Sequence, residues 1–199
     1  VGELPALVAH APTLTFNASQ AAMVKREMAR DPENAEREFG AVFMSGGSLV
    51  FFDVATLEKA LALACPITSP SQLLPGDVVA AGLDCGFRAD SSTLAIVVRR
   101  GNAYYLVALE ERRPKPGAPL KPSETLAEFA SICVRWSVEY VVADGHYLET
   151  VREHTTRHKL RLVPAPSSKE RPYVRSRNLL REERVKLPNN PRLVQQLKE

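Results

Sequence analysis

Cysteine, glycine and long apolar runs are all scarce in this chain of 199 residues. Its three cysteines, Cys65, Cys85 and Cys133, are too widely spaced for a disulfide framework, and no CxxC pair offers a thiolate zinc site. No run of about 18 apolar residues predicts a membrane helix. The first residues also lack the charged start and apolar stretch of a signal peptide. We therefore expect a soluble protein of a reducing compartment, without a membrane partner.

Phosphate-binding glycine loops are also missing. The ten glycines form no GxxxxGK[ST] pattern, so these residues do not include a P-loop ATPase. The net charge is only +3, but the chain from Arg157 onward contains twelve Lys and Arg residues and only four acids. A polyanion such as DNA is one explanation of this basic end, because Lys and Arg neutralise backbone phosphates. Charged helix faces that only solvate the protein are the other.

Residues 1–76 are predicted to be a helical lead-in. Asn17 is expected to cap a helix, and Asp31-Pro32 places a capping carboxylate before a proline at a helix start. The segment CPITSPSQLLPG then has three prolines, which deny regular structure its backbone donors. We place the boundary of the main domain, residues 77–199, after it.

The main domain begins with three predicted strands, 78–84, 92–100 and 102–111, joined as an antiparallel meander. Ser123 is expected to cap a helix with apolar residues on one face. A buried strand at 139–145, a helix at 147–158 and a strand at 160–165 follow. The alternation continues weakly with a helix near 174–183, a strand at 184–188 and a helix from Pro191. The pattern predicts an α/β fold with a mixed sheet, flanked by helices.

Two acids, Asp84 and Asp144, each close an apolar strand before a glycine-containing turn. A right-handed crossover would place the two strands parallel and side by side, about 5 Å apart. The carboxylates would then leave the same sheet edge and could share hard divalent cations. The alternative for either residue is a turn-forming aspartate that accepts backbone hydrogen bonds. The presence of both acids favours a metal site.

The sequence resembles one known family of domains, the C-terminal nuclease domain of the large terminase subunit of tailed bacteriophages. Four segments carry the resemblance in the family's order. They are ARDPENAEREFGAVFMSGGSLVFFDVATLEKAL, GLDCGFRADSSTLAIVVRRGNAYYLVALEE, VEYVVADGHYLETVREH and LLREERVKLPNNPRLVQQLKE. The first is similar to the segment that links the family's ATPase domain to its nuclease. The second and third are similar to its two acidic strands with their neighbours, and the fourth to the strand and helix before its last acidic strand.

The resemblance implies an RNase H-like fold and an endodeoxyribonuclease that cleaves concatemeric double-stranded DNA by two-metal hydrolysis. Asp84 and Asp144 would be the catalytic metal ligands for Mg²⁺ or Mn²⁺. It also implies an ATPase domain in the same full-length protein, a small terminase subunit and a portal as partners, and the host cytoplasm as location. The family's third acid normally follows the last helix and has no counterpart here, so we expect it beyond residue 199, in a domain truncated at its C-terminus. Weak metal affinity and weak cleavage follow.

Further residues are candidates for supporting roles. Asp90 either holds a metal-bound water or caps the turn, of which the turn is favoured. His146 follows Asp144 closely, although a histidine at a helix start is usually structural. The candidate phosphate contacts are Lys169, Arg171, Arg175 and Arg177. A surface charge run explains these four equally well.

Two other functions remain open. A nucleotide-binding half of an actin, Hsp70 or sugar-kinase-like protein shares the early topology, but its glycine-rich phosphate loops are missing here. A non-catalytic DNA-binding module would use the basic end alone.

Overall fold

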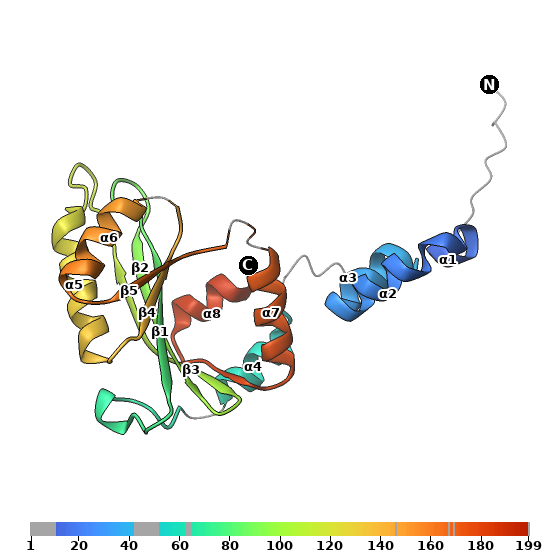
Figure 1. Ribbon diagram of the computed structural model, residues 1–199, viewed down its shortest axis with the longest axis horizontal. Helices are drawn as coiled ribbons and strands as arrows, with labels where there is room; N and C mark the ends of the chain where they lie inside the picture. Colours follow the sequence, from blue (N-terminus) through green and yellow to red (C-terminus); the bar gives the residue numbers. More distant parts are fainter. Residues whose placement is uncertain are drawn as a thin grey trace. The chain divides into compact units, whose positions relative to one another are not determined.

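A computed structural model describes residues 11–41, 52–62, 65–145, 147–166, 168 and 170–198. The chain divides into two compact units, Val1–Leu49 and Val50–Glu199 (Figure 1). None of the described helices is long and apolar enough to cross a membrane.

The first unit is helical, as the sequence predicts. Its elements are α1 (Thr13–Phe16), the short 3-10 helix η1 (Ala18–Gln20), α2 (Ala21–Arg30) and α3 (Pro32–Phe39). The predicted helix start at Pro32 is confirmed by α3, because proline fits the first helical position, where its missing N–H has no partner to lose. The predicted cap at Asn17 is wrong. Its side chain accepts a hydrogen bond from the Ser19 hydroxyl (2.6 Å) and makes no capping bond to a helix amide.

The second unit is built on a six-stranded mixed sheet of order β5-β4-β1-β2-β3-β6. The strands are β1 (Val78–Asp84), β2 (Ser92–Arg100), β3 (Ala103–Arg112), β4 (Tyr140–Ala143), β5 (Arg161–Pro164) and β6 (Val185–Lys186). Strands β1, β2 and β3 form the predicted antiparallel meander. Strands β4 and β5 continue the sheet in parallel from β1, and β6 pairs in parallel with β3. The predicted α/β mixed sheet flanked by helices is therefore confirmed.

The helices cover both faces of the sheet. They are α4 (Val54–Ala62), α5 (Pro122–Arg135), α6 (Leu148–Arg157), α7 (Glu170–Arg181) and α8 (Pro191–Lys198), with a 3-10 turn η2 at Pro70–Gln72. Figure 1 shows α5 and α6 on one face and α4, α7 and α8 on the other. Helix α5 joins β3 to β4, and α6 joins β4 to the parallel β5. Right-handed crossovers place both helices on the same face of the sheet.

The main core lies between the sheet and the α5–α6 layer. Buried and less buried residues alternate along β1 and β2, so one face of each strand packs inward. Leu94, Ile96 and Val98 of β2 are at most 1% exposed, and Phe129 of α5 is 2% exposed. Each such side chain contributes about 1.5–3 kcal/mol on burial. This core holds β1 and β4 rigidly, and both strands carry a candidate acid.

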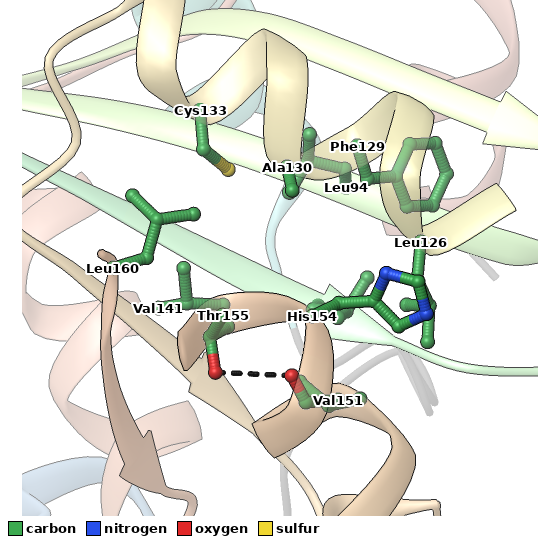
Figure 2. Close-up of a pocket in the computed structure, with 11 residues that line it drawn as sticks. Leu94, Leu126, Phe129, Ala130, Cys133, Val141, Val151, His154, Thr155 and Leu160 are labelled. Carbon is green, nitrogen blue, oxygen red and sulfur yellow. Dashed lines mark hydrogen bonds between the residues drawn. The ribbon is translucent and has the colours of Figure 1, made fainter. Parts of the chain in front are cut away.

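Polar side chains also enter this core. His154 of α6 is only 4% exposed and lines a small cavity of about 20 Å³ with residues of α5 and the sheet (Figure 2). No described protein group hydrogen-bonds its Nδ1. The neighbouring Thr155 hydroxyl donates instead to the carbonyl of Val151 (3.0 Å). A buried imidazole nitrogen requires a hydrogen-bond partner, because burial removes it from bulk water.

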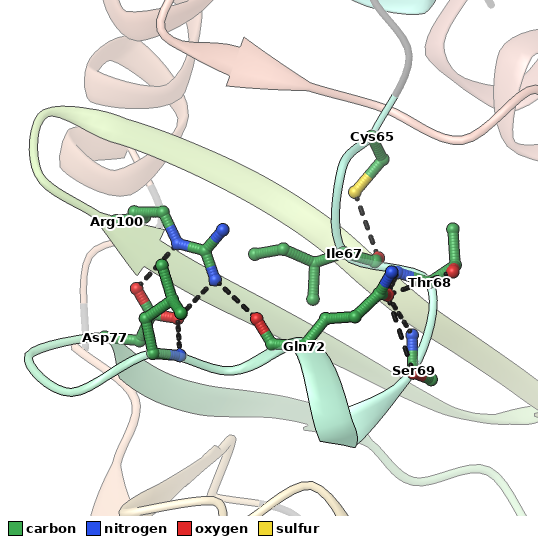
Figure 3. Close-up of polar contacts among 8 residues, drawn as sticks. Cys65, Ile67, Thr68, Ser69, Gln72, Asp77 and Arg100 are labelled. Carbon is green, nitrogen blue, oxygen red and sulfur yellow. Dashed lines mark hydrogen bonds and ion pairs between the residues drawn. The ribbon is translucent and has the colours of Figure 1, made fainter.

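The proline-rich segment is fixed to the start of the sheet. Arg100, at the end of β2, donates from Nε to Asp77 Oδ1 (2.9 Å) and from a terminal nitrogen to Asp77 Oδ2 (2.6 Å). The same nitrogen donates to the carbonyl of Gln72 (2.8 Å), and the Gln72 side chain accepts from the amides of Thr68 and Ser69 (Figure 3). The prolines thus prevent regular structure without loosening the segment.

The compact unit begins before the boundary predicted at Gly76. A second apolar cluster joins Phe52 and Leu57 to Leu180 of α7, and the amide of Leu187 donates to the carbonyl of Ala60 (3.0 Å). These contacts include α4 in the sheet-containing unit. The assignment of residues 1–76 as a linker remains a prediction.

Two helix starts differ from the sequence-based expectation. Helix α5 begins at Pro122, one residue before Ser123, and no side chain caps it. Proline at the first position explains this start. Helix α7 begins at Glu170 and not near Val174, because Pro172 lies within the first turn, where the helix requires no amide donor from it.

Candidate acidic site

Asp84 and Asp144 lie side by side at one edge of the sheet. Strands β1 and β4 are parallel, and Leu83 is the register partner of Ala143. Each aspartate is the next residue along its strand. The crossover through α5 thus brings together two acids that are 60 positions apart, as the sequence predicted.

The alternation of the strands decides which way these acids face. Leu83 and Ala143 are buried in the α5–α6 core, at 8% and 2% exposure. Because successive side chains of a strand point to opposite faces, Asp84 and Asp144 leave toward the other face. There they avoid the cost of an uncompensated charge in the apolar core.

Both carboxylates line one cavity of about 430 Å³. Its floor is formed by Gly82 beside Asp84, by Val142 beside Asp144, and by Thr93, the register partner of Asp84 on β2. Thr93 adds a hydroxyl next to the acids, which the sequence analysis missed. The register of the β1–β2 hairpin was the signal that could have identified it.

The turn after Asp84 is closed by hydrogen bonds. The hydroxyl of Ser92 donates to the carbonyl of Gly86 (2.7 Å) and accepts from the amide of Gly86 (3.2 Å). A Cβ at Gly86 would lie 2.7 Å from the Cβ and the carbonyl oxygen of Asp90. Asp90 is exposed, packs against Gly86 and is not among the described residues that line the acidic cavity. Its role at a metal remains a prediction.

The turn after Asp144 contacts the turn after Asp84. Tyr147 has φ of 61°, in the left-handed region that residues with a Cβ rarely adopt. Its ring meets Phe87 edge-on, with centroids 4.8 Å apart. Phe87 is itself buried, and its carbonyl accepts from the amide of Leu120 (2.8 Å). His146, the neighbouring candidate, lies outside the described residues.

The thiol of Cys85 lies beside the two acids, and its pKa is affected by them. Its pKa is raised to about 12, first by burial and then by the negative charges of Asp144 and Asp84. The thiol therefore stays protonated at neutral pH and does not serve as a nucleophile there.

The donor set fits a hard divalent cation, because carboxylate oxygens are the ligands that Mg²⁺ and similar ions prefer. Asp84 and Asp144 are the residues that would hold it. No group of three His, Cys, Asp or Glu side chains within the described part of the chain is arranged to bind a metal. Glu111 lies in the same cross-strand row, opposite Thr93, but it pairs with Arg113 (3.1 Å) and Arg192 (3.0 Å).

The predicted phosphate contacts on α7 differ in how exposed they are. Arg171 and Arg175 are exposed, whereas Arg177 is buried at 8% exposure, so its guanidinium is poorly placed to meet a phosphate. Lys169 lies outside the described residues. Arg175 lines a second cavity on the sheet. The DNA-binding role of all four remains a prediction.

A three-strand meander followed by parallel strands, with acids ending β1 and β4, is an RNase H-like arrangement. Comparison with solved structures gives the same result. The large terminase nuclease from thermophilic phage G20c with bound magnesium superposes with a TM-score of 0.60 and 18% identity, covering 77% of this chain and 81% of that one. The HK97 bacteriophage large terminase gives 0.58 and 19% identity, covering 92% and 45%. The large terminase from another thermophilic bacteriophage gives 0.65 and 10%, covering 94% and 46%.

The resemblance to large terminase nuclease domains is thus confirmed at the level of fold. No protein-family model matches the chain, and no curated protein matches its sequence. The chain spans less than half the length of the two large terminases that it matches, from HK97 and from the second thermophilic bacteriophage.

Proposed function

We propose that this chain is the nuclease domain of a viral DNA-packaging terminase, an endodeoxyribonuclease that cuts concatemeric double-stranded DNA. The observation that supports this most is the pairing of Asp84 with Asp144 at the ends of parallel strands, on the fold of the terminase nucleases. Two solved structures of the G20c nuclease hold magnesium and cobalt. We therefore propose that the acidic cavity takes Mg²⁺ or Mn²⁺, as part of a two-metal site.

The cations would activate water and support the departing oxygen of the cleaved phosphodiester. The protein's own share is to hold the two carboxylates together and to direct both of them into the acidic cavity. Because the described residues supply two carboxylates and no third, metal affinity should be weak and cleavage slow. The proposed setting is the host cytoplasm, with an ATPase domain of the full-length protein, the small terminase subunit and the portal as partners.

The turn after β1 favours this function over nucleotide binding. Gly86 is the glycine of that turn, and its amide already pairs with the Ser92 hydroxyl. It is therefore not available to a nucleotide phosphate, which binds to unpaired backbone amides in glycine-rich loops.

The test is nicking of supercoiled plasmid by the chain at millimolar Mn²⁺. We expect slow, EDTA-sensitive nicking that Asp84→Asn and Asp144→Asn each reduce at least 100-fold, the order of loss of one electrostatic catalytic group. Glu149→Gln is the matched control, an exposed acid of α6 on the opposite face of the sheet, and should nick like the parent chain. Nicking that survives both active-site changes would refute the assignment.

A further inference from the structure

A second cavity of about 430 Å³ lies on the same face of the sheet as the acidic one. Its floor includes Val78 and Ala80 of β1, whereas the acidic cavity begins at Gly82 and ends at Asp84. These alternate residues share one face of the strand, so the two cavities adjoin along β1. The six steps from Val78 to Asp84 span about 20 Å at roughly 3.3 Å per residue.

The charge of the second cavity is unbalanced. Arg99 of β2 and Arg175 of α7 both line it, both are exposed, and no acid lies among its lining residues. Neither arginine makes a hydrogen bond or ion pair with another described residue. The adjacent Arg100, by contrast, is held in two hydrogen bonds by Asp77. Two unpaired guanidinium groups at one cavity repel each other unless an anion lies between them.

The lining also supplies the donor groups that a phosphate requires. Tyr104 is the register partner of Arg99, and Tyr140 that of Ala80, so two tyrosines flank the arginines on one surface. Guanidinium groups bind phosphate oxygens through paired N–H donors, and a tyrosine hydroxyl can donate a further hydrogen bond. Phosphate is therefore the ligand chemistry that fits.

We propose that this cavity binds a backbone phosphate of the DNA duplex whose cleaved phosphate lies at the acidic cavity. The inference rests on the proposed nuclease function. The separation of about 20 Å corresponds to roughly six base pairs at 3.4 Å each. Arg99 and Arg175 would thus hold the duplex in register while Asp84 and Asp144 address another of its phosphates.

The experiment measures binding without cleavage. Fluorescence anisotropy with a labelled 24-base-pair duplex in EDTA, over a series of salt concentrations, compares Arg99→Ala and Arg175→Ala with the parent chain. Arg135→Ala is the matched control, since Arg135 is an exposed arginine of α5, on the opposite face of the sheet, without a partner among the described residues. We expect about tenfold weaker binding for each cavity variant, and a salt slope reduced by about 0.9 per arginine. The control should bind like the parent.

Equal losses for all three variants, or none, would overturn the proposal. Competition by ATP identifies the source of the phosphate. If ATP displaces the duplex at equal phosphate concentration only when Arg99 and Arg175 are present, the cavity is a nucleotide site and the proposal fails. Weak, arginine-independent competition supports it.

The two proposals fail separately. If the protein binds the duplex through Arg99 and Arg175 but never nicks it, the nuclease function is refuted and the duplex contact stands. Nicking with unchanged binding of both variants refutes the contact alone.

Discussion

The rings of Phe87 and Tyr147 meet edge-on, 4.8 Å apart at their centroids, and join the turns that follow the two acidic strands. Phe87 comes three residues after Asp84, and Tyr147 three residues after Asp144. This ring contact therefore links the two turns that follow Asp84 and Asp144. The left-handed backbone of Tyr147 costs free energy that the surrounding packing must offset.

Substitutions at Tyr147 should separate the ring contact from this backbone cost. Tyr147→Phe keeps the ring that contacts Phe87 and should cost less than Tyr147→Ala. Tyr147→Ala loses the ring and should cost about 1–2 kcal/mol. Tyr147→Gly should cost less than the alanine change by up to about 1 kcal/mol, because glycine adopts positive φ readily. Urea unfolding measures all three, and equal losses for alanine and glycine would contradict the left-handed conformation.

Gly86 should be intolerant of a side chain. Gly86→Ala places a Cβ 2.7 Å from the Cβ and carbonyl of Asp90, so we expect a loss of about 1–3 kcal/mol in unfolding free energy. The matched control is Gly82→Ala, where an added Cβ meets nothing within 4 Å. Thermal unfolding of both variants decides the matter. A control that is as destabilised as Gly86→Ala would show that any glycine change in this region is harmful.

The Asp77–Arg100 pair should make stability depend on pH. The hydrogen bond from Arg100 is the main cause that holds the pKa of Asp77 below its usual value. A lowered folded-state pKa stabilises the protein above the unfolded value of about 3.9, and this contribution is lost as pH falls further. Asp77→Asn should therefore cost about 2 kcal/mol at pH 7, with the difference from the parent shrinking below about pH 4.

Urea unfolding between pH 7 and pH 3 measures this difference. The control is Glu149→Gln, which removes an acid paired with Arg152 on the surface, with its side chain 81% exposed. It should change stability little at any pH. A difference for Asp77→Asn that is constant over the whole range would mean that the carboxyl charge is not responsible.

The core histidine should be replaceable by an apolar side chain. His154→Leu removes a buried nitrogen that no described protein group satisfies, so we expect the unfolding free energy to rise by about 1 kcal/mol. At the neighbouring position, Thr155→Val loses the hydrogen bond to the Val151 carbonyl. Its unfolding free energy should fall by about the same amount. Destabilisation by His154→Leu, measured in urea, would show that the imidazole has a bonding role in the core.

The sequence predicted the strands better than the helix starts. Apolar residues at positions 78–84 and 92–100 located β1 and β2 to the residue, because burial on one or both faces leaves a clear pattern. The Asp84–Asp144 pairing followed from a single rule, the handedness of the crossover. The start of α7 was misplaced: the helix begins at Glu170, and Pro172 lies in its first turn, where a proline is tolerated.

Other contacts between distant residues could not be predicted from the sequence. Arg99 of β2 and Arg175 of α7 line the same cavity, and nothing in either local segment indicates this. The ion pair between Glu111 and Arg192 depends likewise on where α8 lies. Such pairings are set by tertiary packing and not by local propensity.

Anomalous scattering from a crystal soaked in Mn²⁺ tests the central claim most directly, because it locates the ion and both carboxylates at once. We predict a manganese peak in the acidic cavity, in contact with oxygens of both Asp84 and Asp144, that is lost in Asp84→Asn and Asp144→Asn crystals but persists in Glu149→Gln. Manganese bound elsewhere, with the two carboxylates directed to different sides of the sheet, would contradict a shared metal site and with it the nuclease function.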